Sequence, residues 1–133
     1  MSDYKLTILN NKHSVEVLSK DNIGIEKCVY KLTFPDDSIY IGVATQNVWD
    51  RIQNHTTHFM NSKTRKDKAI KKFRKFKVDI LRVCESEAEA LYYERVFIEE
   101  IARNIYYEST GLVDYDKSCR HLVKHKLLND TNY

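Results

Sequence analysis

Residues 28–43 read CVYKLTFPDDSIYIGV, and this stretch decides the fold. Its two ends, residues 28–34 and 39–43, are rich in β-branched and aromatic side chains, which favour strands. Between them, residues 35–38 read PDDS, a composition typical of a turn. The stretch therefore predicts a β-hairpin.

Two helices and a third strand are predicted after the hairpin. Apolar residues at helical spacing indicate a first helix, which Thr45 or Asn47 can cap, and a second helix, which Asp67 can cap. Residues 78–84 are again rich in β-branched and apolar side chains and predict the third strand.

A long helix completes the predicted core. Residues 86–89 read SEAE, a capping box that opens a helix reaching to about Arg103. We therefore predict an α/β fold in which a small antiparallel sheet of about three strands is flanked by helices, in the order β-β-α-α-β-α. The chain is expected to form one domain, with a lead segment (residues 1–26), a core (27–107) and a basic helical tail (108–133).

The lead segment is harder to interpret than the core. Tyr4, Leu6 and Ile8 alternate as in a strand, whereas residues 14–20 fit either a strand or a short helix. Its secondary structure is left open.

Composition limits the classes of protein to be considered. With 42% hydrophobic and 31% charged residues, the chain has the balance of a packed soluble domain. No apolar run approaches the roughly 20 residues that cross a bilayer, and the first residues lack the build of a signal peptide, so we expect no membrane association and a cytoplasmic location. Cys28, Cys84 and Cys119 are odd in number and far apart, which favours reduced thiols over disulfides.

Charge is unevenly distributed along the chain. Residues 50–82 contain eleven Lys or Arg and three acidic residues, whereas residues 85–116 contain nine acidic and two basic residues. We call the lysines and arginines of residues 63–75 the basic block. Its simplest interpretation is a solvated surface, and a more specific one is binding to the backbone of a polyanion such as DNA. The candidate contact residues are Lys63, Arg65, Lys66, Lys68, Lys71, Lys72, Arg74 and Lys75.

One acidic residue lies where an apolar one is expected. Leu91, Ile98 and Ile101 form an apolar stripe along the last helix, and Glu94 falls on it. Burying an unpaired carboxylate costs several kcal/mol, so Glu94 should have a cation beside it. That cation is either an arginine in a salt bridge or a bound metal ion.

Four further side chains suit phosphate chemistry. Arg51 and His55 are four residues apart and share one face of the first helix, where a guanidinium can bind a phosphate and an imidazole can move a proton. Tyr30 and Tyr40 belong to the hairpin, and phenols can hydrogen-bond a phosphate or a water. Taken singly, such residues are common on solvated helices and in the cores of sheets.

Together, these residues resemble the GIY-YIG nuclease family. The resemblance rests on Cys28-Val29-Tyr30, Tyr40-Ile41-Gly42, Arg51, His55 and Glu94, in that order and at those spacings, over about Lys27 to Arg103. Cys28 and Val29 stand where the family usually has glycine and isoleucine. An asparagine that often follows the family's glutamate by about fifteen residues has no evident counterpart at Tyr107-Glu108-Ser109.

The resemblance implies a role for each matched residue. Tyr30 would contact or activate the attacking water, Tyr40 would orient the water or the scissile phosphate, and Gly42 would allow close backbone packing. Arg51 would hold the phosphate and His55 would be an accessory catalytic residue. Glu94 would be the protein ligand of one Mg²⁺ or Mn²⁺ ion per active site, a cation that binds oxygen ligands and keeps several waters.

The function predicted from the sequence is a metal-dependent DNA endonuclease that hydrolyses phosphodiester bonds with an activated water. The alternatives are a catalytically inactive nucleic-acid-binding module on the same fold and a protein-interaction domain whose basic and acidic halves pair between subunits. Self-association into a homo-oligomer would let two single-strand cuts combine. A zinc site at Cys119, His121 and His125 is a further, weaker alternative.

Overall fold

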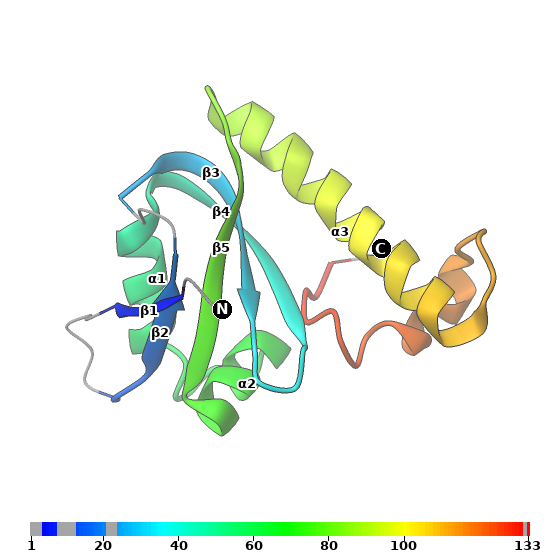
Figure 1. Cartoon of the computed structure of the whole chain (residues 1–133), viewed down its shortest axis with the longest axis horizontal. Coiled ribbons are helices and arrows are strands. Elements are labelled where there is room, and N and C mark those ends of the chain that lie inside the picture. The colour runs from blue at the N-terminus through cyan, green and yellow to red at the C-terminus, as the bar shows by residue number, and fades with distance from the viewer. Residues whose placement is uncertain (1–3, 8–12, 21–23, 132) are drawn as a thin grey trace.

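A mixed β-sheet with helices on both sides forms the protein (Figure 1). The computed structural model describes residues 4–7, 13–20, 24–131 and 133. In chain order the elements are β1 (Lys5–Thr7), β2 (Glu16–Ser19), β3 (Glu26–Thr33), β4 (Ile39–Asn47), α1 (Val48–Thr57), α2 (Arg65–Phe73), β5 (Lys75–Val83), α3 (Glu87–Thr110) and the short 3-10 helix η1 (Lys117–Leu122). No helix in these described parts of the chain is long and apolar enough to cross a membrane.

The five strands lie in the order β1-β2-β5-β3-β4. β3 and β4 form the predicted antiparallel hairpin, and its register places Tyr30 opposite Gly42. Its turn is fixed by the Asp36 carboxylate, which accepts hydrogen bonds from the backbone nitrogen and the hydroxyl of Ser38 at 3.0 and 2.5 Å. β5 pairs antiparallel with β3 and parallel with β2, so β5 is the central strand.

The prediction of about three antiparallel strands was wrong, because the sheet has five strands and is mixed. From β3 to α3 the elements follow in the predicted order, and the two additional strands come from the lead segment. These strands are only three and four residues long, too short for their periodicity to be decisive. β1 is held by pairing with β2, and β2 by pairing with β5. The Tyr4 hydroxyl, beside β1, donates to the Asp79 carboxylate of β5 at 2.7 Å. Ile8, which would extend the first of them, lies outside the described residues.

The helix ends show which side chains satisfy the free backbone groups. Asn47 caps α1 as predicted, because its side-chain oxygen accepts from the backbone nitrogen of Trp49 at 2.8 Å. The prediction of Asp67 as the cap of α2 was wrong: Thr64 is the cap, and its hydroxyl donates to the Asp67 carboxylate at 2.9 Å. α3 continues seven residues beyond the predicted end at Arg103, to Thr110, and Gly111 ends it in the left-handed conformation at φ 74°.

The end of the chain is not the basic helix that the sequence predicted. After the short helix η1, the chain becomes irregular and docks on the edge of β4 (Figure 1). The Asn129 amide accepts from the backbone nitrogen of Ile41 at 2.9 Å and donates to its carbonyl at 2.8 Å. Leu127 bridges to Ile39 in the parallel sense. This segment thus satisfies backbone groups at the outer edge of the sheet.

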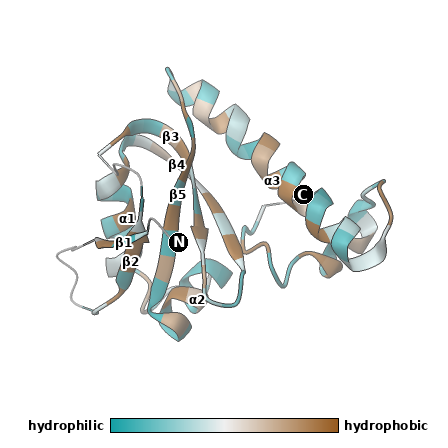
Figure 2. Cartoon of the chain, in the orientation of Figure 1, coloured by the Kyte–Doolittle hydropathy of each residue, from teal (hydrophilic) through white to brown (hydrophobic). Residues whose placement is uncertain are grey.

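Two hydrophobic clusters hold the layers together, one on each side of the sheet. Neighbouring residues of β3 point to opposite faces, so Tyr30 joins the cluster under α1 and α2 while Val29 joins the one under α3. Figure 2 shows hydrophobic residues along the central strands and alternating hydrophilic and hydrophobic turns along α3. Cys28 and Cys84 are buried, Cys119 is partly buried, and all three are free thiols, as predicted.

Candidate active site

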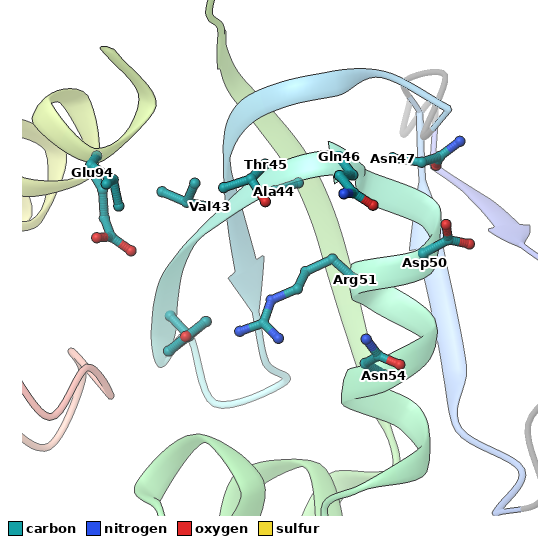
Figure 3. A pocket seen from close by; sticks show the side chains of 11 residues that line it. Val43, Ala44, Thr45, Gln46, Asn47, Asp50, Arg51, Asn54 and Glu94 are labelled. Atoms are coloured by element: carbon teal, nitrogen blue, oxygen red, sulfur yellow. The ribbon is translucent and has the colours of Figure 1, made fainter. Parts of the chain in front are cut away.

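A cavity of about 440 Å³ lies between β4, α1 and α3 (Figure 3). Tyr40 lines it from β4, Arg51 and Asn54 from α1, and Leu91 and Glu94 from α3. Three of the residues singled out in the sequence therefore share one cavity, although Arg51 and Glu94 are 43 residues apart in the chain.

Arg51 and Glu94 face the same space without forming an ion pair. Figure 3 shows both side chains reaching into the cavity from opposite walls. Among the described residues, the ion pairs within 4.0 Å do not include Glu94, so the salt bridge to an arginine, one of the two alternatives left open by the sequence, is not formed. Burial raises the pKa of Glu94, and the nearby Arg51 partly opposes this shift. The carboxylate is thus available to a cation that enters the cavity.

Tyr40 is the phenol that lines the cavity. It is partly buried, and burial raises its pKa, with a further rise from the Glu94 carboxylate, while the Arg51 guanidinium lowers it. At neutral pH Tyr40 is therefore a neutral hydroxyl that can both donate and accept a hydrogen bond.

Tyr30 lies beneath the cavity wall and is completely buried. Burial is also the main cause of the strong rise in its pKa, and the Tyr40 phenol adds to it. A β-carbon at Gly42 would lie 2.4 Å from the Tyr30 hydroxyl oxygen, so the absence of a side chain at Gly42 is what lets the Tyr30 ring lie against β4. Close packing at Gly42 is also what the resemblance to the family implies.

Gly42→Ala is expected to destabilise the fold, because the new methyl group would overlap the buried Tyr30 ring, which would have to shift within the core. Overpacking of this kind costs about 1–3 kcal/mol in the free energy of unfolding. Urea denaturation followed by circular dichroism would measure the loss. Ala44→Gly, two residues along the same strand, is the matched control, since it also exchanges glycine and alanine but adds no atom. Undiminished stability of Gly42→Ala would mean that the Tyr30 ring can shift without cost, contrary to this account.

His55 is also buried, with 3% of its surface exposed, and does not line the cavity. Its Nε2 lies 2.6 Å from the hydroxyl oxygen of Tyr30. Burial lowers the pKa of His55 well below its ordinary value, and the positive charges of Lys66 and Arg51 lower it further. The imidazole is therefore neutral at neutral pH, and its Nε2 contacts the buried Tyr30 and not the cavity.

Lys66 contacts this buried pair, although its sequence context suggested a surface residue that binds DNA. Its Nζ lies 2.9 Å from Nδ1 of His55, 3.2 Å from the Asp67 carboxylate and 5.3 Å from the centre of the Tyr40 ring. The sequence does indicate that Lys66 faces the core, because Lys66 falls on the same face of α2 as the buried Ile70, four residues later.

Two other members of the basic block have contacts within the protein. The Arg65 guanidinium pairs with Asp130 at 2.9 Å and donates to the carbonyl of Leu127 at 3.0 Å, which ties α2 to the end of the chain. Arg74 donates to the carbonyl of His13 at 2.9 Å. The exposed members of the block are Lys63, Lys68, Lys71, Lys72 and Lys75.

The donor set at the cavity suits a hard divalent cation with one protein ligand. Glu94 offers carboxylate oxygens to a space large enough for waters and a phosphate, as Mg²⁺ or Mn²⁺ requires. In the part of the chain that the structure describes, no three His, Cys, Asp or Glu side chains are grouped so that they could hold a metal, which gives no support to zinc at Cys119, His121 and His125.

Comparison with known proteins shows the family to which the chain belongs. A family model described as the GIY-YIG catalytic domain matches residues 26–106, about three fifths of the chain. The chain therefore belongs to the GIY-YIG family and carries a nuclease-type domain, whose substrate is a nucleic acid. Comparison with curated proteins and with solved structures gave no significant match.

Proposed function

We propose that this protein is a DNA endonuclease that hydrolyses a phosphodiester bond with water, with the help of Mg²⁺ or Mn²⁺ held by Glu94. The observation that carries the proposal is the convergence of Arg51, Glu94 and Tyr40 on one cavity. A guanidinium, a carboxylate without a partner among the described residues and a neutral phenol are the groups that phosphate binding, cation binding and water orientation require.

Arg51 would bind the scissile phosphate. Its guanidinium is permanently charged and planar, so it can donate two parallel hydrogen bonds to phosphate oxygens and stabilise the charge that grows on them during attack. Tyr40 would order the attacking water with its hydroxyl group, because Tyr40 is the phenol that lines the cavity. When a divalent cation is bound at Glu94, it supplies Lewis-acid stabilisation of the phosphate and of the leaving oxygen.

Tyr30 and His55 would support the reaction from beneath the cavity wall. Both are buried and joined by a 2.6 Å hydrogen bond, and the Tyr30 ring lies against the backbone of Gly42 in β4. Arg51 interacts electrostatically with both tyrosines and with His55. We therefore propose that the Tyr30–His55 pair fixes the position and the charge balance of the groups that contact the substrate.

The direct test is cleavage of supercoiled plasmid DNA by the purified protein. We expect nicked product with Mg²⁺ or Mn²⁺ and none after chelation with EDTA. Direct linearisation without a nicked intermediate would indicate that two copies of the chain act together on the duplex. DNA binding without cleavage in the presence of either cation would instead support the inactive nucleic-acid-binding module, and neither binding nor cleavage would support the charge-paired interaction domain.

The exposed lysines of α2 are proposed to contact the DNA backbone. Lys68, Lys71 and Lys72 lie at helical spacing on one exposed face of α2, the helix whose Lys66 reaches the buried pair below the cavity. Replacing these three lysines with glutamine should weaken binding to all DNA sequences alike and flatten the plot of log affinity against log salt by about two to three units, because each phosphate contact contributes about −0.9 to its slope.

Fluorescence anisotropy at several salt concentrations would measure this slope. The matched control replaces Lys5, Lys20 and Lys27, three exposed lysines on or beside other strands, and should leave the slope unchanged. An equal effect of both triple substitutions would show that only the overall charge of the protein matters. That result would contradict a binding surface on α2.

A further inference from the structure

Three side chains from three different elements form a continuous chain of hydrogen bonds below the cavity. Nζ of Lys66, on α2, lies 2.9 Å from Nδ1 of His55, on α1. Nε2 of the same imidazole lies 2.6 Å from the hydroxyl oxygen of Tyr30, on β3. Both nitrogens of the ring therefore have a partner, and the two partners differ in what they can donate.

The chemistry of Lys66 decides which nitrogen of His55 carries the proton. An ammonium group has three donors and no acceptor, so its partner Nδ1 must present a lone pair. A neutral imidazole has a single N–H, which is then on Nε2 and points at Tyr30. We infer that Lys66 is a positioning residue that fixes the tautomer of His55, so that His55 donates a hydrogen bond to the Tyr30 oxygen instead of accepting one from it.

The residues around Lys66 keep its ammonium group beside His55. Its side chain is only 14% exposed, Asp67 lies 3.2 Å from Nζ, and the Tyr40 ring lies below the ammonium. Burial lowers the pKa of Lys66, and the Asp67 carboxylate opposes this shift. The ion pair with Asp67 favours the charged form of Lys66, which donates to His55.

The charged and titratable groups that face His55 come from four elements. They are Tyr30 on β3, Tyr40 on β4, Arg51 on α1 and Lys66 on α2. The two phenols are neutral and the other two groups are cationic, so the environment favours a neutral imidazole.

This arrangement has a consequence for the reaction, which rests on the proposed nuclease function. Nε2, the nitrogen that faces Tyr30, already carries a proton, and the lone pair of Nδ1 accepts from Lys66, so His55 has no free lone pair with which to take the proton of Tyr30. His55 instead stabilises electron density on the Tyr30 oxygen, and the proton of Tyr30 is directed away from the imidazole. Lys66 therefore acts on the site through His55 and Tyr30 and not by contact with DNA.

Long-range ¹H–¹⁵N NMR of the full chain, labelled with ¹⁵N, tests the tautomer directly. In the wild-type protein we expect His55 to keep a protonated Nε2 and an unprotonated Nδ1 over about pH 5 to 8, the range in which an ordinary histidine titrates. In Lys66→Met, which keeps an unbranched side chain one atom shorter but loses its charge and its donors, we expect a rise in the pKa of His55 and loss of the single tautomer.

Lys68→Met is the matched control, since Lys68 is exposed on the same helix. It should give the wild-type spectrum. A protonated Nδ1 in the wild type would overturn the inference even if Lys66→Met does not fold, and so would an unchanged tautomer in a folded Lys66→Met protein.

Cleavage kinetics form the second readout and distinguish failure of this inference from failure of the proposed function. Lys66→Met should lower kcat by about tenfold to a hundredfold, as expected for loss of a group that orients a reacting side chain, with little change in KM for DNA. A higher KM with unchanged kcat and tautomer would place Lys66 among the lysines that contact DNA and overturn the inference. If the wild-type protein cleaves no DNA, the proposed function fails, and the NMR measurement still decides the tautomer.

Discussion

Arg51→Ala is expected to lower the rate of DNA cleavage by a factor of about 10² or more, because it removes the group that stabilises charge on the phosphate in the transition state. Arg51 is exposed at the cavity and none of the ion pairs among the described residues includes it, so its loss should leave the fold intact. Single-turnover cleavage of a labelled duplex, with saturating enzyme and Mg²⁺, would separate this chemical effect from weaker binding.

Two further variants sharpen the experiment on Arg51. Arg51→Lys keeps the positive charge but loses the planar pair of donors, so it should recover only part of the rate. Arg103→Ala removes an exposed arginine of α3 that does not line the cavity and should cleave at the wild-type rate. Near-normal turnover by Arg51→Ala would remove Arg51 from the active site.

Glu94→Gln should abolish cleavage while it preserves the fold and DNA binding. The amide has the shape of the carboxylate but is a poor ligand for Mg²⁺. Burial already raises the pKa of Glu94, which means that the folded protein disfavours the charged form, and the melting temperature of the variant should be unchanged or higher. Plasmid cleavage, thermal unfolding and Mn²⁺ binding followed by electron paramagnetic resonance would measure the three properties.

Glu100→Gln is the control for this variant, since Glu100 is exposed on the same helix and does not line the cavity. It should bind Mn²⁺ and cleave DNA as the wild type does. If Glu94→Gln unfolds at a clearly lower temperature, Glu94 stabilises the fold through its charge, and the cation-binding role proposed here is wrong. Retained Mn²⁺ binding by a folded Glu94→Gln protein would be equally decisive against it.

The sequence predicted the parts of the site that depend on local periodicity. The hairpin brings Tyr30 opposite Gly42, and the spacing of Arg51 and His55 on a helix needed no knowledge of tertiary structure. The apolar stripe around Glu94 likewise singled out a carboxylate, which the structure places at the cavity. These features are encoded within a few consecutive turns or a single hairpin, and so they could be inferred from the residues alone.

Features that depend on contacts between distant segments could not be obtained in this way. Lys66 and Arg65 are neighbours in a basic run, yet one reaches the buried His55 and the other the carbonyl groups near the end of the chain. From composition alone both Lys66 and Arg65 would be assigned to the surface, because composition does not show which segment packs beside α2. The docking of Asn129 on Ile41, 88 residues away, is a contact of the same kind.

The central place of β5 in the sheet sets an order in which the chain can fold while it is being synthesised. β3 and β4 are joined by a short turn and can pair as soon as both have left the ribosome, because closing a short loop costs little entropy. Among the described residues β2, although made earlier, pairs with β1 and with β5, and the residues of β5 that it meets come 59 positions later, Glu16 beside Lys75. The first two strands of the chain can therefore join the sheet only after β5 has been made, and their hydrogen bonds are separate from those of the hairpin that carries Tyr30 and Tyr40.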